Sequence, residues 1–172
     1  MTFAAMLQAL RGQVEILDRR GNLDISVSAI TDDSRTVQAG SLFVAVKGEQ
    51  TDGHKFIPVA VKSGMAAAVL QEPATELLIP FVRVADSRKA LGLLGNHFYG
   101  APSSKLRMIG VTGTNGKTTT TYVCKTLLEA LGRRVGLIGT VAYQIGNETI
   151  SASHTTPGAL ELQQLLAKMV AG

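Results

Sequence analysis

The sequence predicts an α/β protein made of a small mixed α/β domain followed by the beginning of a second α/β domain whose sheet is incomplete. Two observations lead to this fold class. Short apolar runs and helical patterns follow one another along the chain of 172 residues, as expected for strands and helices packed in layers. Aromatic residues make up only 5% and Trp is absent, whereas the aliphatic residues and glycine that suit α/β folds are plentiful.

The first part of the chain, residues 1–103, is predicted to mix strands and helices. Thr2 can cap a short helix whose apolar face runs from Phe3 to Leu10 and which ends at Gly12. A second helix follows Gly53, and Asp86 caps a third. The strands expected between these helices are short apolar runs, namely Val14–Leu17, Leu23–Ile30, Ser41–Val46, Ala66–Leu70 and Phe81–Val84.

The second part, residues 106–172, follows a segment of linker composition, Tyr99–Lys105. It begins with an apolar run, Leu106–Val111, and a helix comes soon after. The next strand is expected at Arg134–Gly139, and Gly146-Asn147 is a turn signal that would join two strands into a hairpin. The remaining predictions concern apolar faces and caps: Cys124, Leu127, Leu128 and Leu131 on the first helix, Thr140–Ile145 and Thr149–Ser153 in the hairpin, Thr156 as cap before Pro157, and Leu162, Leu165, Leu166 and Met169 on the last helix.

Between the apolar run and the helix lies a loop rich in glycine and threonine, Gly113–Thr119, which we call the phosphate loop. A strand that delivers glycines to the start of a helix lets backbone N–H groups surround an anion. Lys117 adds a positive charge, and Thr118 adds a hydroxyl of the kind that contacts Mg²⁺ in such loops. The strict spacing G-x-x-x-x-G-K-[ST] is not met, because Val111 stands where its first glycine would be. The alternative, a Gly/Thr-rich turn with an exposed lysine, leaves the dense run of loop residues unexplained.

Composition excludes several functional classes. The net charge is +4, but Lys and Arg are scattered, so no nucleic-acid surface is indicated. The single cysteine, Cys124, excludes an internal disulfide and is expected to be a core residue rather than a nucleophile. No apolar run reaches the roughly 18 residues of a membrane span, and no signal pattern opens the chain. We therefore expect no membrane insertion, a cytoplasmic location and a monomer.

The distribution of acidic residues predicts that the chain is a piece of a longer protein. Nucleotide-hydrolysing α/β domains hold Mg²⁺ with a carboxylate at the end of a second strand. Beyond Asp86 the only acidic residues are Glu129, Glu148 and Glu161, and none of them ends a predicted buried strand. We therefore expect an N-terminal fragment, with no catalytic residue that can be assigned within it.

Five separate segments resemble the Mur ligase family. They are Gly110–Thr120, Asp33-Ser34-Arg35, Gly40–Val44, Asp52-Gly53-His54 and Thr155-Thr156-Pro157. Together they are similar to the branch that adds the third amino acid of the peptidoglycan stem peptide. The resemblance implies an N-terminal domain that binds the UDP end of the substrate (residues 1–103), the truncated first part of an ATP-binding central domain (residues 106–172), and a C-terminal domain that is absent.

The resemblance also implies the ligands. They are ATP with Mg²⁺, UDP-N-acetylmuramoyl-L-alanyl-D-glutamate (UDP-MurNAc-L-Ala-D-Glu), and an amino acid, either meso-diaminopimelate or lysine. ATP would activate a substrate carboxylate as an acyl phosphate, which an amino group attacks to give an amide. The residues implied for the ATP phosphates are Gly113, Thr114, Asn115, Gly116, Lys117, Thr118 and Thr119, with Thr118 also at the metal. Those implied for the substrate are Asp32, Ser34, Glu49, Gln50, Thr51, His154, Thr155 and Thr156.

Other interpretations stay open at this point. Asp33-Ser34-Arg35 also suits a polar turn after a strand, and Thr155-Thr156-Pro157 also suits a helix cap. The chain could be a nucleotide or UDP-sugar binding module without catalysis, another Mur-type ligase, or a folylpolyglutamate-type ligase. The fragment itself is expected to bind its ligands without turning them over.

Overall fold

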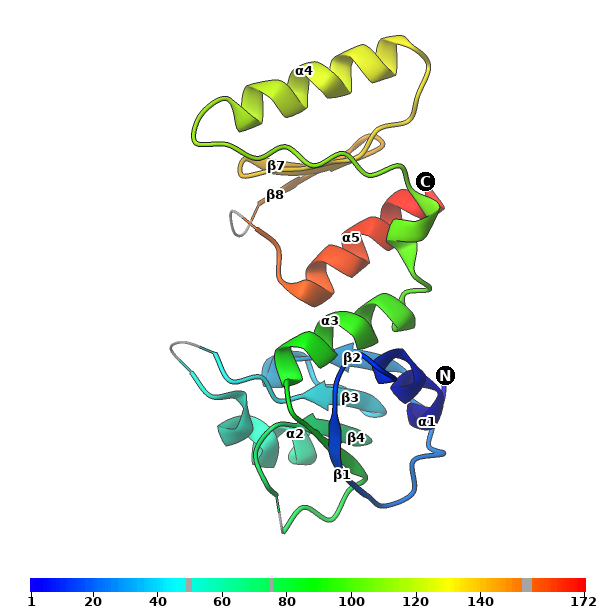
Figure 1. The fold of residues 1–172 in the computed structure, drawn as a ribbon, viewed down its shortest axis with the longest axis vertical. Helices are drawn as coiled ribbons and strands as arrows, with labels where there is room; N and C mark the ends of the chain where they lie inside the picture. The colour runs from blue at the N-terminus through cyan, green and yellow to red at the C-terminus, as the bar shows by residue number, and fades with distance from the viewer. Residues whose placement is uncertain (49–50, 75, 153–155) are drawn as a thin grey trace. The chain divides into compact units, whose positions relative to one another are not determined.

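The structure is a computed structural model that describes residues 1–48, 51–74, 76–152 and 156–172. The chain divides into two compact units, Met1–Phe98 and Tyr99–Gly172, which are coloured blue to green and green to red in Figure 1. Each unit combines helices with a sheet of its own. The prediction of an α/β fold is therefore confirmed.

The first unit is built on a five-stranded sheet in the order β1-β5-β4-β3-β2. The strands are β1 (Ile16–Arg20), β2 (Ala29–Thr31), β3 (Ser41–Val44), β4 (Ala67–Leu70) and β5 (Phe81–Val84). Strands β2 to β5 pair in parallel, and β1 pairs antiparallel with β5. Because parallel neighbours end at the same edge of a sheet, the segments that follow β2, β3, β4 and β5 gather along one edge.

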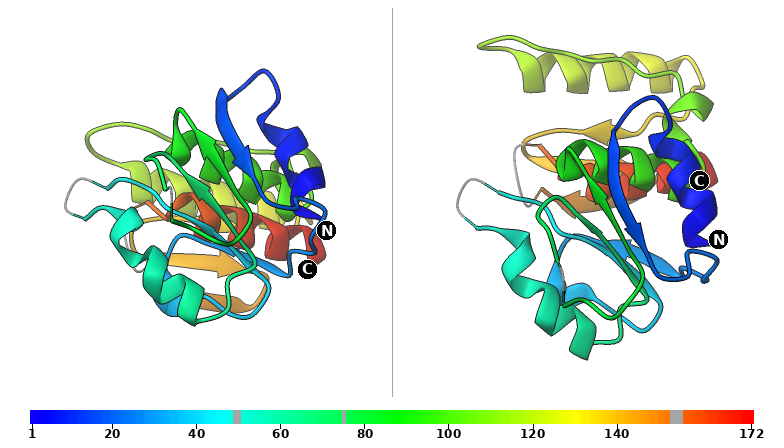
Figure 2. Two further views of the ribbon diagram at one scale, coloured as in Figure 1. Left: turned by 90° about the horizontal axis from the view of Figure 1, so that it is seen from below. Right: turned by 60° about the horizontal axis from the view of Figure 1, so that its bottom comes forward.

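Helices cover both faces of this sheet. The N-terminal pair α1 (Phe3–Met6) and η1 (Leu7–Leu10) contacts α3 (Ser87–Phe98), and the shorter helices η2 (Ser34–Thr36) and η3 (Gly53–Phe56) contact α2 (Ile57–Lys62). Figure 2 shows α2 on the side of the sheet opposite α3. Both predicted caps are confirmed, since the Thr2 hydroxyl accepts from Ala5 N at 3.2 Å and the Asp86 carboxylate from Lys89 N at 2.9 Å.

Alternation along the strands fills both layers of the core. Phe43 and Ala68 point toward Ala60 of α2 in one buried cluster. Their neighbours Leu42 and Val69 are also fully buried, and because strand side chains alternate, they face the opposite layer. The sheet is thus apolar on both faces, as parallel sheets require.

The predicted strand Leu23–Ile30 is wrong over most of its length, because only Ala29–Thr31 forms β2. The preceding residues pair with the N-terminus instead. The backbone N–H groups of Phe3 and Ala4 donate to the carbonyls of Ile25 and Leu23, and Val27 N donates to Met1 O. The backbone groups of this alternating segment therefore form their hydrogen bonds with the start of the chain.

The second unit holds a three-stranded antiparallel sheet and two long helices. Its elements are η4 (Pro102–Lys105), α4 (Lys117–Ala130), β6 (Leu137–Ile138), β7 (Ala142–Ile145), β8 (Glu148–Ser151) and α5 (Ala159–Ala171). The predicted hairpin is confirmed, with Ile145 opposite Glu148 and Gly146 at φ +55° in the turn. The strand expected at Arg134–Gly139 is limited to β6. Helix α5 begins after Gly158 and not at Pro157, so the predicted cap at Thr156 is wrong.

Two predictions for the start of this unit are also wrong. Leu106–Val111 is extended but belongs to no strand, and Ile109 is 64% exposed. The apolar face predicted for α4 is not buried either, because Leu127 and Leu131 are 60% and 75% exposed and Cys124 is half-buried. Both failures have one cause. A parallel strand and its covering helix need neighbouring strands, and in the described part of the chain none pairs with Leu106–Val111.

A cleft of about 830 Å³ takes the place of a filled core beside this segment. Leu106, Ile109, Leu128 and Leu166 are among its lining residues, and the phosphate loop is not. No helix among the described residues has the length and apolarity needed to cross a bilayer.

Candidate functional site

The phosphate loop has the backbone of an anion-binding turn. Gly113 and Gly116 adopt φ values of +151° and +79°, which side chains disfavour. Gly116 is the N-cap of α4, a helix of 14 residues, and an added Cβ would meet no atom within 4 Å there. The loop around it is exposed. The N–H groups of the first turn of α4 therefore open onto free space in which a phosphate group fits.

Lys117 lies at the centre of this turn. Its Nζ donates to the carbonyl oxygens of Gly113 at 2.6 Å and Thr114 at 3.2 Å. These two hydrogen bonds hold the ammonium group against the backbone of the phosphate loop. A cation fixed in this position complements a polyphosphate.

Hydroxyl groups adjoin the loop on α4. Thr118 Oγ1 lies 3.4 Å from Thr140 Oγ1, which follows the carboxyl end of β6. Thr140 was not among the residues predicted from the sequence. Its position after a short apolar strand and Gly139 was the available signal, since the ends of strands in α/β folds carry site residues.

The acidic residues of the second unit are Glu129, Glu148 and Glu161. Glu129 pairs with Lys125 at 2.5 Å on α4, Glu148 begins β8, and Glu161 lies in the first turn of α5. Among the described residues no group of three or more His, Cys, Asp or Glu could hold a metal ion. The donor set beside the loop is therefore hydroxyl and backbone, which fits a Mg²⁺ ion that takes its other ligands from phosphate and water.

A second set of candidate residues gathers at the carboxyl edge of the sheet in the first unit. Asp32 and Ser34 come directly after β2, and Thr51 lies in the loop after β3, the neighbouring strand. Asp32 and Ser34 thus lie close to the end of β2, whereas Thr51 lies farther from the end of β3, just before η3. Ligands of open α/β sheets bind at this edge.

The turn after β2 is rigidly built. Thr31 Oγ1 lies 2.6 Å from Thr36 Oγ1, and the Asp33 carboxylate accepts from Arg35 through its backbone N–H at 2.9 Å and its guanidinium at 2.7 Å. Within the described residues the Ser34 hydroxyl has no hydrogen-bond partner. The polar turn considered above is real, and it leaves Ser34 available to a ligand.

The pKa values of the two carboxyl groups in this turn, Asp32 and Asp33, are shifted in opposite directions. The hydrogen bond from the Arg35 side chain lowers the pKa of Asp33. Burial raises the pKa of Asp32, and the neighbouring charge of Asp33 adds to the effect. Asp32 still reaches solvent, so the desolvation is partial. Carboxyl groups with a pKa raised in this way are common where a ligand binds.

The remaining predicted residues are placed less fully. Thr51 is exposed, and its carbonyl accepts from Gly48 N at 2.9 Å. Thr156 is exposed in the segment before α5, and no hydrogen bond among the described residues joins it to the phosphate loop. The predicted substrate residues Glu49, Gln50, His154 and Thr155 lie outside the described residues.

Both units resemble domains of known proteins. The model described as Mur ligase family, catalytic domain, matches residues 26–99, and the model described as Mur ligase middle domain matches residues 111–172. The chain belongs to the Mur ligase family. Mur ligases are ATP-dependent, which agrees with the form of the phosphate loop.

A curated relative narrows the comparison within the Mur ligases. The UDP-N-acetylmuramoyl-L-alanyl-D-glutamate--2,6-diaminopimelate ligase of Alkaliphilus metalliredigens is 46% identical over 95% of this chain and 33% of its own length. The chain thus spans about a third of the length of the curated relatives it matches. The branch indicated by the sequence is the one to which these relatives belong.

Solved structures agree on the fold. A structure of a UDP-N-acetylmuramoyl-L-alanyl-D-glutamate--2,6-diaminopimelate ligase superposes with a TM-score of 0.78 over 99% of this chain and 34% of that one, at 24% identity. The MurF ligase of Thermotoga maritima, solved in complex with ADP, is 26% identical, with a TM-score of 0.53 over 81% of this chain and 28% of that one. Both units of the chain therefore have the Mur ligase fold.

Proposed function

We propose that this chain supplies the UDP-binding and phosphate-binding parts of an ATP-dependent ligase that joins 2,6-diaminopimelate to UDP-MurNAc-L-Ala-D-Glu. The observation that carries the proposal is the phosphate loop, in which two glycines of positive φ and the ammonium of Lys117 surround the start of α4. The relatives named for this reaction supply the choice of substrates.

In the first unit, Asp32, Ser34 and Thr51 would hold the uridine end of the substrate. They lie in the segments that follow the adjacent parallel strands β2 and β3, and Ser34 is half-buried in a turn fixed by Asp33 and Arg35. Hydroxyl, carboxylate and backbone groups of this kind suit the polar edge of uracil and its ribose. Glu49 and Gln50, on the same loop as Thr51, belong to this proposal on sequence alone.

In the second unit, the phosphate loop would bind ATP with Mg²⁺. ATP, when bound, supplies the phosphoryl group that turns a poor electrophile, a carboxylate, into a reactive one. The chain's own part is to hold the phosphates: backbone N–H groups of Gly116 to Thr119 and the ammonium of Lys117 would neutralise their charge. Thr118, with Thr140 beside it, would face the metal ion. His154, Thr155 and Thr156 are proposed to face the muramoyl peptide.

The uridine site is tested by calorimetric titration of the chain with UDP-MurNAc-L-Ala-D-Glu. We expect Ser34→Ala to weaken binding about five- to tenfold, the value of one hydrogen bond of about 1 kcal/mol. Ser63→Ala is the control, because Ser63 is an exposed serine at the C-cap of α2 and outside the proposed site, and it should leave the affinity unchanged. Equal affinities of wild type and Ser34→Ala would remove Ser34 from the site.

The second candidate function is binding without turnover by the 172-residue chain itself. It is favoured by the positions of Glu129, Glu148 and Glu161, which lie near the end of α4, at the start of β8 and in the first turn of α5. Mixing the chain with ATP, Mg²⁺, UDP-MurNAc-L-Ala-D-Glu and 2,6-diaminopimelate distinguishes the two. Formation of the amide would show that the chain is a ligase by itself, whereas binding of both nucleotides without amide would support the module. We propose a cytoplasmic, monomeric protein in either case.

A further inference from the structure

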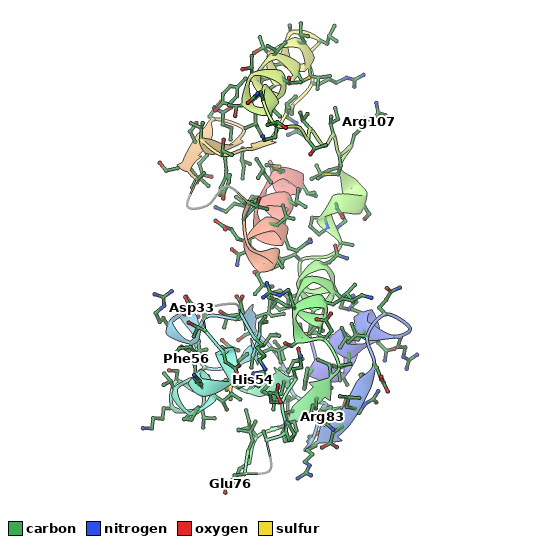
Figure 3. All side chains as sticks on the ribbon, turned by 60° about the vertical axis from the view of Figure 1, so that its left-hand side comes forward. Asp33, His54, Phe56, Glu76, Arg83 and Arg107 are labelled. Carbon is green, nitrogen blue, oxygen red and sulfur yellow. The ribbon has the colours of Figure 1, made fainter. Side chains whose placement is uncertain are left out.

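His54 is the centre of a polar cluster that the proposed site does not yet use. Its Nδ1 lies 2.6 Å from Asp52 Oδ1, and its backbone N donates to the same oxygen at 3.0 Å. The side chain is 11% exposed. Figure 3 shows His54 and Asp33 in the same part of the first unit. If His54 served only to begin η3, its Nε2 atom would need no hydrogen-bond partner.

The far nitrogen of this imidazole has two partners. His54 Nε2 accepts from the backbone N–H groups of Gln71 at 2.9 Å and Glu72 at 3.2 Å, directly after β4. A nitrogen that accepts two N–H groups carries no proton, so the single ring proton lies on Nδ1 and is donated to Asp52. The contact between His54 and Asp52 is therefore a hydrogen bond of the neutral ring.

The same cluster fixes the loop Lys47–Gly53 at both of its ends. At its start, Arg88 Nη2 donates to Lys47 O at 3.2 Å, and Lys47 Nζ lies 3.6 Å from Glu72. At its end, Asp52 is held by His54, and Lys47 and Asp52 face each other in an isolated bridge. Gln71 extends the cluster to α3, because its Oε1 accepts from Ser87 N and Oγ at 3.2 Å.

We propose that His54 is a positioning residue for the nucleoside diphosphate of the substrate. Through Asp52, which follows Thr51 in the chain, it ties the end of the loop that carries Thr51 to the carboxyl end of β4. The inference rests on the proposed function of this edge and goes beyond it by adding a residue that does not itself contact the ligand.

The experiment is calorimetric titration with UDP-MurNAc-L-Ala-D-Glu at neutral pH. We expect His54→Phe to bind about tenfold more weakly than wild type, because two backbone donors lose their acceptor. His54→Gln keeps an acceptor near Nε2, so its affinity should stay within about threefold of wild type.

Two controls separate this proposal from the proposed function. His97→Gln removes an imidazole at the other end of α3, about 15 Å from Ser87 at 1.5 Å per residue, and should keep the affinity of wild type. Hydrogen exchange of the Gln71 and Glu72 amides, measured without ligand, should be slow in wild type and His54→Gln and fast in His54→Phe. If the amides behave so and wild type binds no nucleotide, the proposed function fails. If nucleotide binds equally well to wild type and His54→Phe, or if His54→Gln binds as weakly as His54→Phe, the positioning role is wrong.

Discussion

Lys117 donates from its Nζ to the carbonyl oxygen of Gly113 across the phosphate loop, at 2.6 Å. This hydrogen bond links Gly113 of the loop to the first residue of α4 and holds the ammonium group at the loop. The carbonyl oxygen holds the positively charged group at the site while no anion is bound. The same ammonium can turn to phosphate oxygens, which are stronger acceptors.

Replacing this lysine should abolish most nucleotide binding. Lys117→Ala removes a charge-assisted hydrogen bond worth about 1.5–3 kcal/mol, so the affinity for ATP should fall at least about tenfold. Lys125→Ala is the control on the same helix, because Lys125 is paired with Glu129 and lies two turns away from the loop. Isothermal titration with Mg²⁺ and ATP measures both variants. An unchanged affinity of Lys117→Ala would mean that the loop does not bind phosphate.

Two glycines with the same backbone separate the conformational requirement of the loop from its function. Gly116 and Gly132 have φ values of +79° and +74°, and an added Cβ meets nothing within 4 Å at either. Gly116→Ala and Gly132→Ala should each cost about 1 kcal/mol of unfolding free energy through the left-handed backbone alone. Only Gly116→Ala should also lose ATP binding, because its methyl group would stand where the phosphates come. Urea unfolding and titration give the two quantities, and a loss of binding in Gly132→Ala would contradict the assignment.

Local signals allowed much of this molecule to be predicted. The cap at Thr2, the cap at Asp86, the turn at Gly146 and the strand Phe81–Val84 each depend on a few neighbouring residues, and each is present in the structure. The phosphate loop is local in the same sense, because its glycines, lysine and threonine follow one another in the chain.

What could not be predicted depends on partners that are distant in the sequence. The segment Leu23–Ile30 alternates like a strand, but its N–H and C=O partners are at Met1, Phe3 and Ala4. The role of His54 depends on backbone groups 17 and 18 residues away, and Thr140 meets Thr118 across 22 residues. Helix α4 has an apolar face in the sequence, yet burial of that face requires strands beside Leu106–Val111, which the described residues do not provide.

The two carboxyls after β2 should affect stability with opposite signs. Burial raises the pKa of Asp32 above its ordinary value of 3.8, so its ionised form destabilises the folded chain at neutral pH. Asp32→Asn should therefore raise the unfolding midpoint at pH 7, and the gain should vanish once the pH is below the ordinary pKa, where the carboxyl is protonated in both states. The variant should also bind UDP-MurNAc-L-Ala-D-Glu more weakly, since Asp32 is proposed to face the ligand.

Asp33→Asn is the matched opposite. The side chain of Arg35 lowers the pKa of Asp33, so this carboxylate stabilises the fold above the ordinary value of 3.8, and that contribution is lost as the pH falls through the lowered pKa. Asp33→Asn should lower the unfolding midpoint at pH 7 and have no effect at a pH below both values. Urea unfolding at pH 7 and at successively lower pH tests both variants, and changes of the same sign at pH 7 would refute the assignment of the two environments.

The pair of threonine hydroxyls beside the loop predicts how Mg²⁺ enters ATP binding. Thr118 and Thr140 approach to 3.4 Å, so an ion on Thr118 would lie within reach of both hydroxyl groups. In wild type, Mg²⁺ should tighten ATP binding; Thr118→Val should remove this gain, and Thr140→Val should reduce it about fivefold, the value of one hydrogen bond of about 1 kcal/mol. Thr126→Val is the control, because the Thr126 hydroxyl donates to Tyr122 O on the same helix, about 13 Å from the start of α4 at 1.5 Å per residue. Titration with ATP, in Mg²⁺ and in a chelator, measures each gain. If Thr140→Val kept the full Mg²⁺ effect while Thr118→Val lost it, Thr140 would only support the loop and would have no part in the metal site.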